Sequence, residues 1–172
     1  DGELIHLIVN HWPSRGADET KRIAAAKVNN KIIDSLRGVY KNPKIITMGD
    51  FNDDPFDKSI KKVLGAKKDR NDVGSKDMYN PFETILVDQG IGTNAYRDKW
   101  QLFDQIIISE SFLKKDYEDY QFYRAGVFNK SFLINKKGKY KGYPFRSFSF
   151  GSFTDGFSDH LPPYIFLIKE IK

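Results

Sequence analysis

Asp50 and Asn52 have the spacing and the chemistry of a pair that could bind a phosphate and a metal ion. They follow Gly49 and the apolar run 44–48. A hard divalent cation prefers oxygen ligands such as a carboxylate, and a phosphate oxygen accepts hydrogen bonds from an amide. Because glycine tolerates a sharp backbone turn, both side chains could leave a strand at its carboxyl end, where open α/β sheets place their sites. The alternative is a turn in which both side chains bond the nearby backbone.

Asp159 and His160 are adjacent and stand just before Leu161 and the last apolar run. An imidazole that titrates near neutral pH is a common general base. Neighbours in a loop can point to different places, so the carboxylate could meet a metal ion while the imidazole meets a water. The alternative is a local cap with an exposed histidine.

Asp104 and His11 complete the set of polar residues beside apolar runs. Asp104 interrupts the run 100–108, and a buried carboxylate needs a partner, for which a protonatable histidine is the natural choice. The alternative is a strand-end aspartate that faces solvent. His11 ends the first apolar run, so it could belong to the same site or be an ordinary loop residue, whereas His6 inside that run is expected to be structural.

The elements that would position these residues form an alternating pattern of strands and helices. The pattern predicts a buried strand over 4–9, a loop over 10–16, a helix over 18–37 with Asp18 as N-cap, a strand over 44–48, a short helix from Pro55 to about Gly65, a surface loop over 66–80, and strands over 100–108 and 164–168. Such an order is typical of a layered α/β domain.

The segment from Tyr120 to Phe157 is rich in aromatic residues, lysine, arginine and glycine. Long irregular connections often carry function, and aromatic rings interleaved with cations can stack on bases and pair with phosphates. Two interpretations follow: a substrate-facing loop, or a surface ribbon whose rings pack on the sheet.

Composition limits the classes of protein that remain. The 172 residues suit one domain, and the 28 basic residues exceed the 23 acidic ones to give a net charge of +5. That excess favours anionic partners such as phosphate esters, although it is also ordinary for a soluble protein. The chain has no cysteine, which excludes disulfides and thiolate metal sites, and no apolar run of about 20 residues, which argues against an integral membrane protein. Residues 1–3 do not resemble a natural start, so any targeting segment would lie outside this sequence, and a secreted, periplasmic or cytoplasmic localisation stays open.

The four polar groups, in this order, resemble the endonuclease/exonuclease/phosphatase superfamily, which includes deoxyribonuclease I, abasic-site endonucleases, neutral sphingomyelinases and inositol polyphosphate phosphatases. The matching stretches are Asn10-His11-Trp12-Pro13-Ser14-Arg15, Gly49-Asp50-Phe51-Asn52, Phe103-Asp104-Gln105-Ile106 and Ser158-Asp159-His160-Leu161-Pro162. The similarity runs from about residue 4 to 169. It implies an α/β (α+β) fold, the deoxyribonuclease I-like four-layer sandwich of two sheets.

The resemblance also implies a role for each residue. His160 would be the general base, and Asp104 would hold its ring. Asp50 and Asn52 would orient the water and the phosphate, and His11 would hydrogen-bond a phosphate oxygen or assist the leaving group. The expected metal ligands are Asp159 and Asp50, with magnesium or manganese as the ion. The residues expected to bind substrate are Asn52, Asn10, Arg15 and Arg146.

The implied function is divalent-metal-dependent hydrolysis of phosphate esters, in first place by a phosphodiesterase or nuclease. A phosphomonoesterase acting on inositol or sugar phosphates would use the same site. A binding module without catalytic activity is the alternative of another class.

One feature of the family is absent from its expected place. The main metal-binding glutamate lies on a strand of the family's first half, whereas Glu3 precedes a strand. We therefore expect residues 1–172 to be the C-terminal part of one domain, and to bind magnesium poorly and hydrolyse substrate slowly or not at all alone. An apolar sheet face would then need a partner, either an N-terminal half or a second copy in a homodimer.

Overall fold

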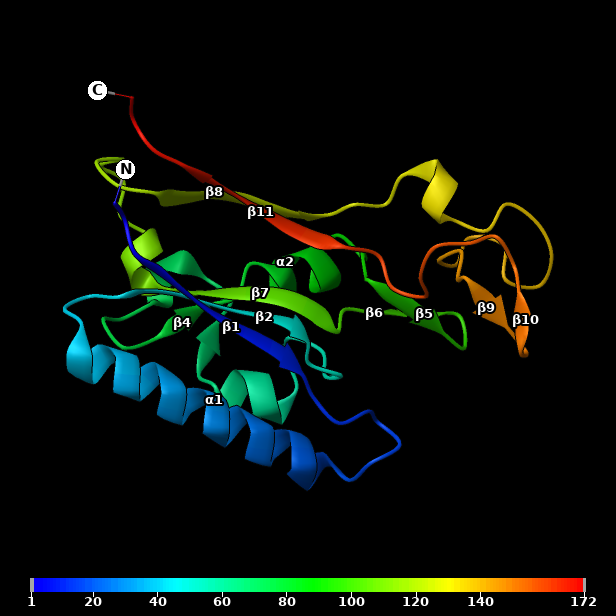
Figure 1. Cartoon of the computed structure of the whole chain (residues 1–172), viewed down its shortest axis with the longest axis horizontal. Helices are drawn as coiled ribbons and strands as arrows, with labels where there is room; N and C mark the ends of the chain where they lie inside the picture. The colour runs from blue at the N-terminus through cyan, green and yellow to red at the C-terminus, as the bar shows by residue number, and fades with distance from the viewer. Residues whose placement is uncertain (1, 172) are drawn as a thin grey trace.

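A mixed five-stranded sheet forms the centre of the computed structural model, which describes residues 2–171 (Figure 1). Its strand order is β1-β2-β7-β4-β3. The strands are β1 (Ile5–His11), β2 (Lys44–Asp50), β7 (Asp104–Ser109), β4 (Met78–Tyr79) and β3 (Ala66–Lys67). β1 runs parallel to β2, and β2 runs antiparallel to β7.

The other strands form three antiparallel pairs. These are β5 (Asn94–Tyr96) with β6 (Lys99–Gln101), β8 (Gln121–Val127) with β11 (Pro163–Ile168), and β9 (Phe148–Ser149) with β10 (Ser152–Phe153). The helices are α1 (Glu19–Val39) and α2 (Phe82–Val87), with a π-turn at Ser59–Val63 and 3-10 turns at Arg70–Asp72, Glu110–Phe112 and Ser131–Leu133.

Helix α1 covers one face of the sheet. It begins as expected at Asp18, whose carboxylate accepts a hydrogen bond of 2.8 Å from the Thr20 backbone N–H. The buried side chains of Ala26 and Ile33 on α1 pack with Ile45 of β2 and Ile107 of β7. Figure 1 shows the helix lying along the sheet below β1 and β2.

The opposite face of the sheet packs against α2 and the β8–β11 pair. Since successive side chains of a strand point to opposite faces, Ile46, Ile106 and Ile108 join Phe82 and Phe122 in a second apolar core. In Figure 1, β8 and β11 lie on the side of the sheet away from α1. The result is an α/β architecture of helix, sheet and second sheet.

The predicted first strand is confirmed as β1, but the prediction that it is buried was wrong. β1 is the edge strand of the sheet, and Leu7 and Val9 are 59% and 73% exposed. The reason is that the β8–β11 pair lies over β7 and leaves this side of β1 uncovered. Leu7 and Val9 form what is called here the β1 apolar strip.

The predicted helix over 18–37 and the strands over 44–48 and 164–168 are confirmed, with bounds shifted by a few residues. The helix expected from Pro55 is confirmed only as the π-turn near its end. The surface loop over 66–80 was wrong in part, because Ala66 and Met78 are buried in the two short strands β3 and β4. Two-residue strands are too short to give a periodic signal.

The single strand predicted over 100–108 is interrupted at Leu102 and Phe103. The Phe103 carbonyl accepts a hydrogen bond of 2.9 Å from the Phe51 N–H, and the Leu102 N–H donates one of 2.7 Å to Asp54 Oδ1. These bonds replace strand pairing and fasten the segment that follows β2 to the start of β7.

The segment 120–157 is less irregular than expected, because it begins with β8. Its remaining part reaches, with β9 and β10, the end of the molecule that also carries β5 and β6 (Figure 1). Within residues 2–171, no helix combines the length and the apolar character needed to cross a bilayer.

Candidate active site

Neighbouring strand ends place His11, Asp50 and Asp104 in one row. His11 is the register partner of Asp50 across β1 and β2, and Asp50 is the partner of Asp104 across β2 and β7. Because side chains directly opposite one another on adjacent strands point to the same face, the three leave the sheet on one side. His11 Nε2 lies 3.7 Å from Asp50 Oδ2. The sheet thus brings together residues that are far apart in the sequence.

Gly49 is needed where β2 passes Asn10. Its φ of +132° is a backbone angle that residues with a Cβ rarely adopt. A Cβ built at this position would lie 2.0 Å from the Asn10 carbonyl oxygen. Glycine therefore allows the close approach of β1 and β2 that sets Asp50 beside His11.

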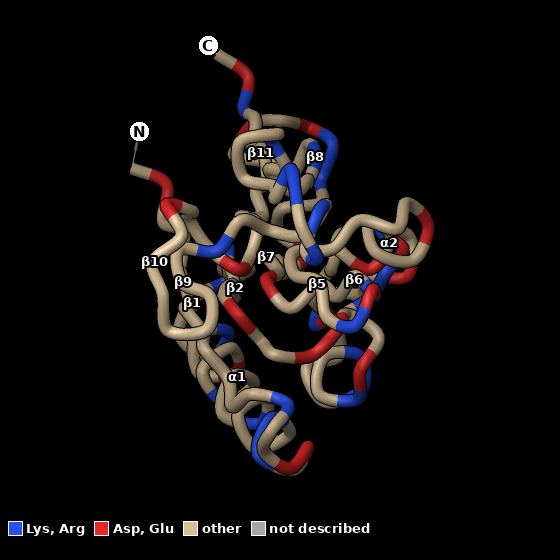
Figure 2. The backbone as a smooth tube through the Cα atoms, turned by 90° about the vertical axis from the view of Figure 1, so that its right-hand side faces the viewer, with Lys and Arg blue, Asp and Glu red and all other residues tan. Residues whose placement is uncertain are grey.

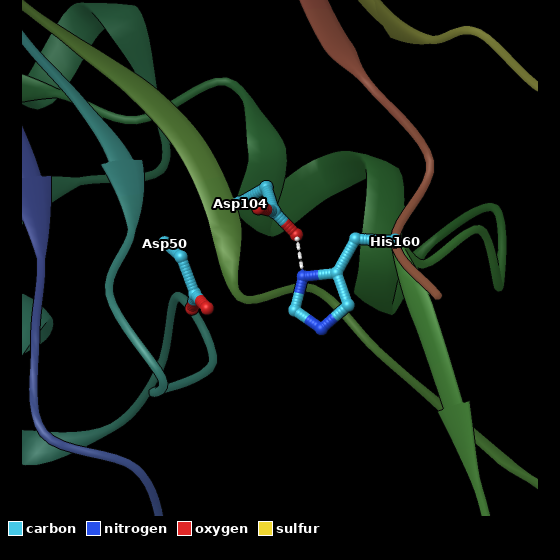
Figure 3. Close-up of side chains that lie close together, drawn as sticks. All are labelled: Asp50, Asp104 and His160. Atoms are coloured by element: carbon cyan, nitrogen blue, oxygen red, sulfur yellow. Dashed lines mark hydrogen bonds and ion pairs between the residues drawn. The ribbon is translucent and has the colours of Figure 1, made fainter. Parts of the chain in front are cut away.

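His160 contacts Asp104 from the loop before β11. Its Nδ1 lies 2.7 Å from Asp104 Oδ2, and the ring's other nitrogen points away from that carboxylate (Figure 3). Among residues 2–171, no hydrogen bond uses this second nitrogen, Nε2. An ionised Asp104 that accepts the Nδ1–H bond leaves Nε2 with a free lone pair, which is the tautomer a general base needs.

The carboxylates around His160 alter its acid strength. Burial lowers the pKa of His160, but the hydrogen bond to Asp104 and the charges of Asp104, Asp50 and Asp159 together raise this pKa above its ordinary value. Burial raises the pKa of Asp50, and the Asp104 charge adds to that effect, while the Asn52 N–H and both histidines oppose it. The three carboxylates therefore stabilise the protonated form of His160.

Thr93 joins both partners of the histidine–aspartate pair. It is fully buried, its Oγ1 accepts a hydrogen bond of 3.3 Å from the Asp104 N–H, and its carbonyl accepts one of 2.7 Å from the Leu161 N–H. Thr93 thereby connects the start of β7 to the residue that follows His160. The sequence analysis missed Thr93, since a lone threonine in a loop has no spacing signal.

Asn52 has the turn geometry that was the alternative interpretation. Its φ is +51°, its N–H donates to Asp50 Oδ1 at 2.8 Å, and its Nδ2 donates to the Trp12 carbonyl at 2.9 Å. The side chain is buried, 8% exposed. Asn52 thus links the end of β2 to the loop after β1, and its contact with substrate stays a prediction.

Asn10 is not brought into the row. Residues 10 and 11 are adjacent on a strand, so their side chains point to opposite faces. Asn10 Nδ2 donates to Thr47 Oγ1 at 2.8 Å, and its Oδ1 accepts from Trp12 Nε1 at 3.0 Å. The amide is therefore engaged in the packing between β1, β2 and α1.

Arg15 lies beside the site but is held by acidic neighbours. Its Nη2 donates to Asp54 Oδ2 at 3.0 Å, its Nε donates to the Asn52 carbonyl at 3.2 Å, and its guanidinium lies 4.5 Å from the Phe103 ring centre. It also pairs with Asp57. These contacts fix the loop after β2, and a role in binding substrate stays a prediction.

Asp159 and Arg146 lie outside the row. Asp159 is exposed, and it is near enough for its charge to favour protonated His160. The exposed Arg146 lines a cavity together with Tyr140 and Tyr143. The predicted roles of Asp159 and Arg146 remain predictions.

Asp53 and Asp54 form a buried acidic group that the sequence analysis did not single out. Asp53 accepts hydrogen bonds from Arg22 Nε at 2.7 Å and Ser59 Oγ at 2.6 Å. Burial raises the pKa of both aspartates, with the hydrogen bonds and the arginines opposing it. Both aspartates lie within four residues of Asp50, and this spacing in the sequence could have pointed to them. Figure 2 shows acidic stretches gathered near the ends of β2 and β7.

Asp50, Asp104 and His160 could together hold a metal ion. One ligand atom from each lies within 4.8 Å of the other two. Magnesium is commonly held by one or two carboxylates, waters and substrate phosphate. Asp50 and the Asp104 oxygen not bonded to His160 suit that donor set.

Glu3 belongs to another place in the fold. Both its carboxylate oxygens accept hydrogen bonds of 3.1 Å from the Tyr120 N–H, and it pairs with Lys44 at the start of β2. Since a strand rises about 3.3 Å per residue, Glu3 lies on the order of 20 Å from the Asp50 end of β2. Within residues 2–171, the metal-binding group contains no glutamate.

The sequence matches one family model over residues 1–169, that of the endonuclease/exonuclease/phosphatase family. The chain belongs to this family. The search of curated proteins found no match.

Two similar solved structures come from Bacteroides thetaiotaomicron. One is a mannosyl-6-phosphatase with a TM-score of 0.53 and 21% sequence identity, in an alignment that covers 94% of this chain and 50% of that one. The other is an endonuclease/exonuclease/phosphatase family protein with a TM-score of 0.52 and 18% identity, in an alignment that covers 96% of this chain and 50% of the other. These likenesses establish the deoxyribonuclease I-like fold. The chain spans about half the length of either protein.

Proposed function

We propose that this protein contributes to metal-dependent hydrolysis of phosphate esters, with His160 as the general base. The observation that carries the proposal is the 2.7 Å contact between His160 Nδ1 and Asp104 Oδ2, with Nε2 directed away from it (Figure 3). In this arrangement Nε2 takes a proton from the attacking water, and Asp104 stabilises the imidazolium that forms.

The neighbouring side chains have supporting roles in the same reaction. Asp50 orients the water, and Asn52 orients the phosphate through its amide. His11, whose side chain is 81% exposed, donates a hydrogen bond to a phosphate oxygen or protonates the leaving oxygen. The ion, magnesium or manganese, would be held by Asp50, with Asp104 or Asp159 beside it. It would offset the negative charge that develops around phosphorus.

The test compares wild-type protein with His160→Ala on bis-p-nitrophenyl phosphate in the presence of magnesium or manganese. Loss of a general base is expected to lower the rate at least about 100-fold. His6→Ala is the matched control, because His6 lies on β1 with its ring against that of Tyr40, at the opposite end of the strand from His11. Equal rates for wild type and His160→Ala, both above the rate without protein, would contradict His160 as the general base.

The substrate is proposed to be a phosphodiester such as nucleic acid, or a sugar phosphate. The aromatic and basic residues of 120–157 suit a nucleic acid, which supports the diester. The second candidate is supported by the mannosyl-6-phosphatase with a similar fold. It is also supported by a cavity of about 380 Å³ lined by Tyr96, Tyr140 and Tyr143 with Arg97 and Arg146. A cavity of this size suits a small molecule.

The two substrate classes are separated by comparing rates on mannose 6-phosphate and on a short DNA duplex. Tyr140→Ala should lower kcat/KM for the sugar phosphate and leave the rate on a small p-nitrophenyl ester unchanged. Tyr123→Ala is the control, since Tyr123 is 56% exposed on β8 and does not line the cavity. Turnover of DNA alone would support the nuclease.

The β1 apolar strip is proposed to contact the protein segment that corresponds to the other half of the longer relatives. The chain spans 50% of either similar structure, and the strip leaves Leu7 and Val9 largely exposed. The chain alone should then sediment as a monomer with low activity. A dimer abolished by Val9→Lys would identify a second copy as the partner instead, and efficient turnover by the monomer would contradict the need for another half.

A further inference from the structure

A second cavity lies at the far end of the sheet from His160. Its volume is about 600 Å³, and Tyr79 of β4 and Thr84 of α2 are among its lining residues. Tyr79 is the register partner of Ile108, four residues along β7 from Asp104. At about 3.3 Å per residue, this separates the cavity from the histidine–aspartate pair by roughly 13 Å along the strand.

The charge balance of this cavity favours anions. Lys68 forms an ion pair with Asp88, with Nζ 2.8 Å from Oδ1, so these two charges cancel. The Asp69 carboxylate accepts a hydrogen bond of 2.9 Å from the Asn71 N–H. Arg70 and Lys115 then supply two positive charges against the single charge of Asp69.

Several donors in the cavity have no partner within the protein. Across residues 2–171, no hydrogen bond or ion pair engages the Arg70 guanidinium, the Lys115 ammonium or the hydroxyls of Tyr79 and Thr84. Tyr79 is only 8% exposed, and burial raises the pKa of its hydroxyl, which keeps the donor proton. Arg70 is positioned by the Phe122 ring, 5.4 Å from the guanidinium carbon to the ring centre.

We propose that this cavity is a binding site for a small phosphorylated molecule, separate from the hydrolytic site. A guanidinium presents two parallel N–H donors that match a phosphate group, and an ammonium and hydroxyls complete the set. The volume exceeds that of a phosphate ion and falls in the range of sites for small organic ligands. The organic part of the ligand would lie against Leu113, Tyr79 and the Lys68–Asp88 pair.

The test is a titration of the isotope-labelled 172-residue protein, followed by NMR, with ribose 5-phosphate and inorganic phosphate as probes. Saturable shifts are expected at the amides of Tyr79, Thr84 and Arg70, with tighter binding of the ester. Arg70→Met should weaken this binding about tenfold or more. Arg124→Met is the matched control, because Arg124 also stacks on a ring, that of Phe166 at 4.8 Å, but lies outside the cavity.

Two further variants keep the test decisive. Lys115→Met replaces the ammonium of an exposed side chain, so it should weaken binding without unfolding the protein. Asp104→Asn should leave the shifts at Tyr79 and Thr84 unchanged, which separates this cavity from the hydrolytic site. Shifts confined to residues around His160, or equal affinity in wild type, Arg70→Met and Lys115→Met, would overturn the proposal.

Discussion

Asp50 and Asp104 are direct partners across the antiparallel strands β2 and β7, so two carboxylates stand side by side at the strand ends. Like charges this close raise the cost of ionising both. Burial is the main cause of the raised pKa of Asp50, and Asp104 adds to it. A cation between them, either protonated His160 or a metal ion, relieves that repulsion.

The first prediction concerns the pKa of His160. Asp104→Asn removes the hydrogen-bonding carboxylate that opposes the effect of burial, so the pKa of His160 should fall. Titration of the imidazole by NMR would measure it in both proteins. Asp34→Asn on the exposed side of α1 should leave the His160 pKa unchanged. An equal or higher pKa in Asp104→Asn would show that Asp104 does not hold the charged ring.

The second prediction concerns stability against pH. The folded-state pKa of His160 is raised above its ordinary value of 6.5. Its contribution to the free energy of unfolding is therefore fully present below about pH 6.5 and is lost as pH rises through the folded-state pKa. Urea unfolding at pH 6 and pH 8.5 should show a smaller decline in His160→Gln than in wild type. An identical decline would exclude this histidine as a source of pH dependence.

The third prediction concerns Gly49. In Gly49→Ala, the new Cβ would lie 2.0 Å from the Asn10 carbonyl oxygen at a φ of +132°. The strands must shift, and the expected destabilisation is on the order of 3 kcal/mol or more. Gly38→Ala is the control, since a Cβ there meets no atom within 4 Å and the residue is helical. That change should be neutral or stabilise the protein by up to about 1 kcal/mol. Similar unfolding midpoints for both variants would contradict the close-approach argument.

The sequence predicted those helices and strands in which the regular spacing of apolar residues extends over many residues. Helix α1 and strand β2 are long enough for their apolar spacing to be read. Strand β8 was not recognised, because Gln121, Arg124 and Gly126 break the apolar alternation. The buried strands β3 and β4 have two residues each, so only their tertiary contacts define them.

The sequence likewise predicted only some of the residues in the candidate site. The predicted convergence of His160 on Asp104 is present, with Nδ1 2.7 Å from Oδ2. Strand alternation alone would have separated Asn10 from His11, since adjacent residues face opposite sides. Thr93 could not be found from the sequence, because its role depends on two backbone contacts made only in the folded chain.

The last prediction separates two carboxylates that could hold the metal ion. Asp50 groups with Asp104 and His160 within 4.8 Å, whereas Asp159 is exposed and outside that group. If Asp50 is the main ligand, Asp50→Asn should weaken manganese binding about tenfold or more, and Asp159→Asn should weaken it less. Paramagnetic broadening of NMR signals by manganese measures both the affinity and the position of the ion. Asp34→Asn serves as the control for a lost surface charge. A larger loss of manganese affinity in Asp159→Asn than in Asp50→Asn would instead make Asp159 the principal ligand. Broadening confined to residues distant from His160 would place the ion elsewhere.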